Sequence, residues 1–98
     1  MTIHQVKNGT ALLIALEGRL DTMTAPNLEE TLKDALEGIE ELTFDFEKLD
    51  YISSAGLRVL LAAQKTMLRQ GSMKVKNVNE IIMEIFEVTG FSDILTIE

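Results

Sequence analysis

The chain of 98 residues is 46% hydrophobic, which suffices for one core and leaves too little for two, so we predict a single domain covering residues 1–98. Its 9 basic and 16 acidic residues give a net charge of -7, which argues against nucleic acid as a partner because phosphate binding needs clustered Lys and Arg. The lack of cysteine and the solitary His4 exclude a disulfide framework and a thiolate metal site, so we expect no metal and no other cofactor.

The N-terminal residues predict a β-hairpin. The segments TIHQV and ALLIALEG read as two strands joined at Asn8 and Gly9, a dipeptide that readily adopts the positive φ angles of a tight turn. The second strand is apolar on both faces, so we place it centrally in the sheet. The first is more polar and suits an edge.

A helix and a third strand follow. Thr24 is a predicted N-cap, Pro26 fits the first helical turn, and Gly38 suits a left-handed residue that ends the helix. One face of this helix carries the apolar residues Leu28, Leu32, Ala35, Leu36 and Ile39. The segment ELTFDFE then alternates apolar and polar residues, which predicts a strand buried on one side.

The second half of the chain continues the alternation of helices and strands. Ser53 or Ser54 caps a predicted second helix that ends near Gly71 and has an apolar stripe of Leu57, Leu60, Leu61, Gln64 and Leu68. SMKVK is a predicted strand, Asn77 or Asn79 caps a third helix that closes at Thr89 and Gly90, and ILTIE is a predicted last strand. This order predicts an α/β fold: a mixed β-sheet of about five strands with helices packed largely on one face.

No apolar run reaches the roughly 20 residues that a membrane span needs. The first residues also lack the basic and apolar segments of a signal peptide. We therefore expect a cytoplasmic protein that does not insert directly into a membrane.

Two serines stand at the start of the second predicted helix, in the stretch YISSAGLRVLL. A serine here either caps the helix, acts as a nucleophile, or accepts a phosphate. Capping needs only Ser53, which would accept the N–H of Gly56 and leave Ser54 with a free hydroxyl. Catalysis would need a nearby base, yet the only histidine lies in a predicted edge strand, so we expect no enzymatic activity. Phosphorylation needs only an accessible hydroxyl and a place where added charge changes the surface potential, and the start of this helix meets both conditions.

Three features in or near this helix can each be explained either by folding or by partner binding. Gly56 in the first turn either lets a partner approach or lets the helix pack tightly on the preceding strand. Small and basic residues, namely Arg58, Ala62, Lys65 and Arg69 with Val59 at the margin, form either a docking surface or a solvated face. Residues 51–79 hold five basic residues and no acid, which either balance acidic neighbours or meet an acidic partner.

Three stretches give the chain a resemblance to the STAS domain family over its full length: LEGRLDTMTAPNL, FDFEKLDYISSAGLRVLL and VTGFSDILTI. This family is shared by anti-sigma factor antagonists and the cytoplasmic tails of sulfate transporters. In antagonists that resemble this chain, the serine two residues before the motif glycine is phosphorylated by the anti-sigma factor, an ATP-dependent serine kinase. The resemblance assigns that role to Ser54. Ser53 replaces the usual aspartate and becomes a second candidate acceptor, while Ala55 replaces a frequent serine or threonine.

The resemblance also matches Asp21 and Thr24 to a segment that lies beside the phosphorylation site. It implies an anti-sigma factor antagonist that works by partner switching: it binds an anti-sigma factor serine/threonine kinase when unphosphorylated, is released by phosphorylation, and is restored by a protein phosphatase. The expected partner-binding residues are Asp21, Thr24, Ser53, Ala55, Gly56, Arg58, Val59 and Ala62. The alternative is a permanent, unmodified scaffold subunit of a transporter or other signalling complex, and direct nucleotide binding is a weaker third option.

Overall fold

The computed structural model describes all 98 residues. The chain forms four strands and four helices in the order β1 (Thr2–Asn8), β2 (Ala11–Leu20), α1 (Ala25–Ala35), β3 (Glu41–Ile52), α2 (Ser54–Gln70), β4 (Ser72–Lys76), α3 (Glu80–Thr89) and α4 (Phe91–Ile94).

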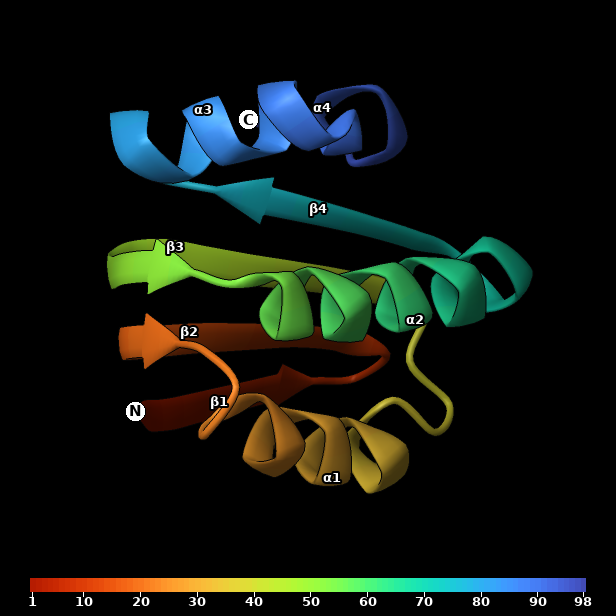
Figure 1. Ribbon diagram of the computed structural model, residues 1–98. Coiled ribbons are helices and arrows are strands. Elements are labelled where there is room, and N and C mark those ends of the chain that lie inside the picture. Colours follow the sequence, from red (N-terminus) through yellow and green to blue (C-terminus); the bar gives the residue numbers. More distant parts are fainter.

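The four strands form one mixed sheet in the order β1-β2-β3-β4 (Figure 1). β1 pairs antiparallel with β2, whereas β2, β3 and β4 run parallel to one another. The predictions of a central β2 and an edge β1 are confirmed. The hairpin turn between them falls one residue later than predicted, because Asn8 pairs with Ala11 and leaves Gly9 and Thr10 as the turn, with Gly9 at φ +65.

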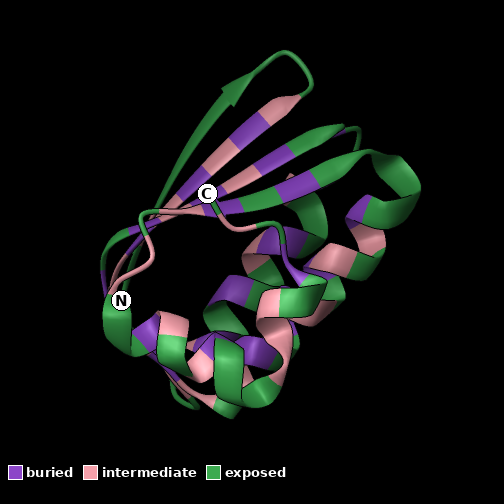
Figure 2. Ribbon diagram, turned by 90° about the horizontal axis from the view of Figure 1, so that it is seen from above, coloured by how far each residue is buried: buried purple, intermediate pink, exposed green.

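One face of the sheet forms the core. Leu12, Ile14 and Leu16 alternate along β2 and are buried, as are Leu42, Phe44 and Phe46 along β3. The helices lie on this side of the sheet (Figure 2) and complete a cluster of 24 buried residues. The period-two pattern read from the sequence therefore identifies the correct face, and the opposite face carries the alternate, more exposed side chains.

The predicted fifth strand is wrong. Residues 91–94 form the short helix α4 after Gly90 adopts a left-handed φ of +82, and only four residues remain to reach the sheet. Ile97 makes a single parallel bridge with Val75, in which Val75 N–H donates to the Thr96 carbonyl at 2.9 Å. The sheet therefore has four strands rather than about five.

The predicted stripe on α2 is correct in part. Leu57 and Leu60 are buried, but Leu68 is 71% exposed, and Ala63 and Met67 are buried in its place. The reason is that α2 packs against α1 as well as the sheet, so its buried side turns toward α1. At the start of α3, Asn79 and not Asn77 is the cap, since its side chain accepts the N–H of Ile82 at 2.8 Å.

Candidate functional site

The two serines differ in exposure. Ser53 lies at the N-cap position of α2, and its N–H donates to the Leu20 carbonyl at 2.9 Å, tying the end of β2 to the start of α2. Its Oγ is buried and has no hydrogen-bond partner, so the prediction that this hydroxyl accepts the N–H of Gly56 is wrong. Ser54, the first residue of α2, is exposed.

Gly56 is required by internal packing. It is buried, and a Cβ at this position would lie 2.7 Å from Leu20 Cγ, 2.8 Å from Ile52 Cγ1 and 3.0 Å from the Leu20 carbonyl oxygen. Of the two readings of this glycine, tight packing of α2 on the preceding strands therefore holds. The expected contact of Gly56 itself with a partner has no exposed surface to support it.

The loop between β2 and α1 is held by Asp21 and Thr24. Asp21 Oδ1 accepts the N–H groups of Met23 at 3.0 Å and Thr24 at 3.1 Å. The Thr24 hydroxyl donates to the Arg19 carbonyl at 2.8 Å and accepts the N–H of Asp21 at 2.9 Å. Thr24 therefore occupies the N-cap position of α1, but its hydroxyl stabilises the loop instead of capping the helix, which corrects the predicted role.

These contacts keep Asp21 ionised. Partial burial raises the pKa of its carboxyl, but the hydrogen bonds from Thr24 and Met23 outweigh that effect and the net pKa is lowered. Arg19 approaches the same carboxylate at 3.8 Å, and its guanidinium carbon lies 4.5 Å from the centre of the Tyr51 ring. The loop thus holds one ionised carboxylate, with Arg19 beside it, in a fixed position near the end of β3.

The loop and the start of α2 lie side by side, as the sequence reading expected. A surface hollow of about 190 Å³ is lined from the loop and α1 by Thr22, Ala25, Pro26 and Glu29, and from α2 by Ala55, Arg58 and Val59. Three residues predicted to bind a partner thus border the same hollow. Val59 is only 5% exposed, so it forms the floor of this surface and not its rim.

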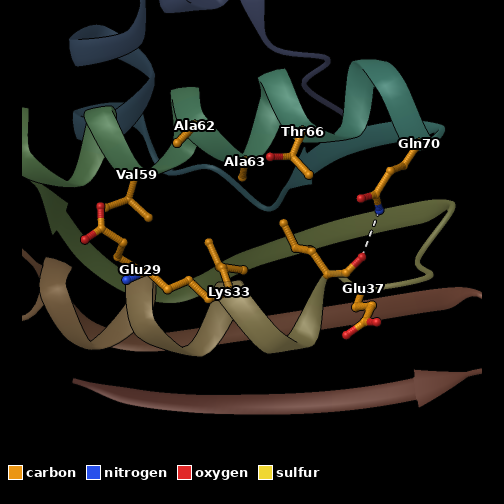
Figure 3. Close-up of a pocket in the computed structure, with 10 residues that line it drawn as sticks. Glu29, Lys33, Glu37, Val59, Ala62, Ala63, Thr66 and Gln70 are labelled. Atoms are coloured by element: carbon orange, nitrogen blue, oxygen red, sulfur yellow. Dashed lines mark hydrogen bonds between the residues drawn. The ribbon is translucent and has the colours of Figure 1, made fainter.

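A larger groove of about 500 Å³ continues along α1 and α2 (Figure 3). It is lined from α2 by Val59, Ala62, Ala63, Thr66 and Gln70, from α1 by residues that include Glu29 and Lys33, and by Glu37 in the turn after α1. Gln70 Nε2 donates to the carbonyls of Leu36 and Ile39, both at 2.8 Å, and so joins the two helices at one end.

The sequence reading missed the far half of this groove. Ala55, Val59, Ala62, Thr66 and Gln70 follow each other at helical spacing, so they share one side of α2, the side that faces α1. That spacing was available in the sequence. Small residues at the first three positions gave no apolar stripe to notice, and Thr66 and Gln70 are polar.

The basic residues of α2 remain free of ion pairs. Arg58, Lys65 and Arg69 are exposed, and none lies within 4 Å of an acidic group. Among the five basic residues in 51–79, only Lys74 is paired, with Glu98 at 3.6 Å. Lys76 also lies close enough to lower the pKa of Asp45 by its charge, so acidic neighbours balance part of this block, and only the three basic residues of α2 lack such a neighbour.

No three His, Cys, Asp or Glu side chains are grouped as a metal site would require. None of the helices combines the length and the apolar character needed to cross a membrane.

Comparisons with known proteins agree on one family. Residues 3–96 match the family model described as "Mlab, STAS domain". The anti-sigma-B factor antagonist of Bacillus subtilis (strain 168) is 30% identical over 92 residues, covering 93% of this chain and 84% of the relative. An anti-sigma factor antagonist from Mycobacterium paratuberculosis has the same fold, with a TM-score of 0.88, 18% identity, and coverage of 98% and 83% of the two chains. The Bacillus cell fate determinant SpoIIAA in its phosphorylated form gives a TM-score of 0.77 at 16% identity, covering 99% and 91%.

Proposed function

Because the chain belongs to the STAS domain family, with relatives that are anti-sigma factor antagonists, we propose that it works by partner switching controlled at Ser54. In its unphosphorylated form it binds an anti-sigma factor that is a serine kinase, and the sigma factor is released. Phosphorylation of Ser54 ends this binding, and a protein phosphatase restores it. The chain itself catalyses no reaction.

The exposure of Ser54 carries this proposal. Its hydroxyl lies at the N-terminus of a helix of 17 residues, where unpaired backbone N–H groups and the helix dipole stabilise added negative charge. A phosphate adds about -1.5 to -2 charges there. The buried Oγ of Ser53 is a poor acceptor by comparison, so of the two serines we choose Ser54.

The loss of binding follows from the surroundings of Ser54. Ala55 and Arg58 line one hollow together with Thr22 of the Asp21–Thr24 loop, and Ala62 lines the adjoining groove. Ser54 directly precedes Ala55, so a partner seated in this hollow lies against the phosphate. Burying a dianion is costly unless every charge is paired. Arg58 lies one helical turn from Ser54, so a phosphate can also pair with it and remove that cation from the docking surface.

The test is a titration of the chain with its cognate anti-sigma factor. We expect Ser54→Asp to weaken binding at least tenfold and Ser54→Ala to bind as tightly as the wild type but resist phosphorylation. Ser72→Asp is a matched control, because Ser72 is also exposed but lies at the start of β4, and it should leave affinity unchanged. Equal affinities for all four proteins would refute the switch.

A second function, a permanent scaffold subunit of a transporter or signalling complex, is favoured by one observation. Ser53 supplies no charge where the related antagonists usually have aspartate, so a feature of the kinase recognition site is missing. Mass spectrometry of the protein from its native cells separates the two functions. The scaffold carries no phosphoserine under any growth condition, whereas the antagonist carries it on Ser54 in some of them.

A further inference from the structure

The outer face of α3 combines an apolar row with an acidic row. Ile81, Ile85 and Val88 follow one another at helical spacing, and Ile81 is 60% and Val88 81% exposed. They border a shallow hollow of about 340 Å³ together with Glu84 and Thr89. Ile82 and Phe86 on the opposite side are fully buried, so the helix is anchored to the core while this apolar row faces solvent.

The acidic row runs parallel to it. Glu80, Glu84 and Glu87 each precede a member of the apolar row by one residue, and all three are exposed. None of them forms an ion pair. No Lys or Arg occurs anywhere after Lys76, so the segment offers them no cation. Like charges at this spacing cost an isolated helix about 0.2–0.5 kcal/mol per pair. Glu80 lies in the first turn, where the helix dipole stabilises it, but Glu84 and Glu87 lie beyond that turn and have no partner inside the chain.

We propose that this α3 face, defined as Ile81, Glu84, Ile85, Glu87 and Val88, is a second docking surface, and that its occupant is an amphipathic helical segment of a partner protein with basic residues flanking its apolar side. The apolar row takes the apolar side of that helix, and the unpaired glutamates pair with its Lys or Arg residues. An anionic membrane is a poor occupant, because it would be repelled by the same glutamates.

This surface does not depend on the switch at Ser54. It belongs to a different helix, and its charge is opposite to that of α2, whose exposed charged groups are Arg58, Lys65 and Arg69. The chain therefore has a basic docking helix and an acidic one, and the two select partners of opposite charge.

The experiment uses a synthetic helical peptide with leucine on one side and lysine on the other, and a matched peptide with glutamate in place of lysine. Isotope-labelled protein is titrated with each and followed by NMR, while calorimetry gives the affinities. We expect the Leu/Lys peptide to bind with shift changes centred on α3 and the Leu/Glu peptide not to bind. Shift changes spread over α1, α2 and β1 would overturn the proposal, since they would report only attraction to the net charge of -7.

Paired variants separate the two rows. One double variant, Ile81→Ser with Val88→Ser, removes apolar residues, and the other, Glu84→Gln with Glu87→Gln, removes charges. We expect each to weaken binding of the Leu/Lys peptide at least tenfold. The matched controls are Leu68→Ser, an apolar residue 71% exposed on α2, and Glu30→Gln with Asp34→Asn, which changes the net charge equally on α1. Both controls should bind within twofold of the wild type. Weakening by the controls to the same extent would overturn the proposal.

Three further measurements complete the test. Circular dichroism melts must show that the exposed substitutions leave the fold intact, which we expect because they remove no buried group. Sedimentation of the wild type over a range of concentrations should show no association through α3. A dimer abolished by Val88→Ser would overturn the proposal, because the occupant would then be a second copy. Ser54→Asp should not alter peptide binding, so failure of the Ser54 switch and failure of this surface give different results.

Discussion

At the scale of single residues, two glycines show how differently a missing side chain is used. At Gly71 a Cβ would lie 1.9 Å from the carbonyl oxygen of Glu40 and 2.7 Å from its carbonyl carbon. These are backbone atoms, and the Glu40 carbonyl also accepts the N–H of Ser72 at 2.9 Å, so it cannot move aside freely. Gly38, in contrast, has φ +77 and no atom within 4 Å of the Cβ position.

We therefore predict that Gly71→Ala lowers the free energy of unfolding by about 3 kcal/mol or more, through steric conflict with the chain before β3. Gly38→Ala should cost about 1 kcal/mol, through its left-handed backbone alone. Urea unfolding of both variants measures the difference. A cost for Gly71→Ala no larger than that for Gly38→Ala would show that the two segments are not in contact.

At the scale of elements, the helices α2 and α3 begin in different ways. Asn79 caps α3 through its side chain and also donates to the Leu49 carbonyl at 3.0 Å, which fixes α3 to β3. Ser53 stands at the equivalent position of α2 with a buried hydroxyl that bonds to nothing. The start of α2 is held by its backbone instead, through the bond from the Ser53 N–H to Leu20.

From this contrast we predict that Ser53→Ala leaves the free energy of unfolding unchanged or raises it by up to about 1 kcal/mol, because a buried hydroxyl without a partner is lost. Asn79→Ala should lower it by about 1 kcal/mol or more. Thermal and denaturant unfolding of the two variants provide the comparison. Equal losses would mean that the Ser53 hydroxyl does stabilise the native chain.

The elements also show what the sequence determines. Alternation along β2 and β3 identifies the buried face, and Pro26 and Asn79 mark the starts of helices, because these signals depend on local geometry. The role of Thr24 could not be predicted, because its hydroxyl can either cap α1 or donate to the Arg19 carbonyl. Which of these hydrogen bonds forms depends on the folded shape of the loop. The exposure of Leu68 depends likewise on where α1 packs.

The candidate site could also be predicted only in part from the sequence. The exposed Ser54 and the neighbouring Asp21–Thr24 loop follow from the motif, whereas the burial of Gly56 and Val59 depends on tertiary contacts with Leu20 and α1. The α3 face was visible in the sequence as a run without Lys or Arg after residue 76. Its apolar row could not be separated from core residues until the structure showed which side of α3 is buried.

At the scale of the whole molecule, two aspartates link folding to pH. Burial raises the pKa of Asp45, but the Asn77 side chain at 2.9 Å and the Glu47 N–H at 3.0 Å donate to its carboxylate, and the net pKa is lowered. The pKa of Asp21 is likewise lowered overall, because the hydrogen bonds from Thr24 and Met23 outweigh the effect of burial. Both carboxyls therefore bind protons more weakly in the folded chain than in the unfolded chain, whose ordinary value is 3.8.

This difference in pKa between the folded and unfolded chain determines how the free energy of unfolding changes with pH. The stabilisation from both groups is fully present above their ordinary pKa and is lost as the pH falls through the lowered, folded values, because the unfolded chain then binds more protons. We predict that the unfolding free energy falls below about pH 4. This loss of unfolding free energy at low pH should be smaller in Asp21→Asn and in Asp45→Asn than in Glu30→Gln. Glu30→Gln is the control because it also removes one negative charge. An unchanged slope in both aspartate variants would contradict the link.

The parallel arrangement of β2, β3 and β4 has a practical consequence for handling this protein. Because each strand is followed by a helix, α1, α2 and α3 all begin at one edge of the sheet, the edge of Ser54 (Figure 1). β1 runs the opposite way and starts at that edge too, where Met1 Cα lies 3.6 Å from the Cβ position of Gly18. An affinity tag fused at Met1 therefore lies at the same end of the sheet as Ser54, the proposed phosphoacceptor, whereas a fluorophore on the Gly9 and Thr10 turn lies at the opposite end.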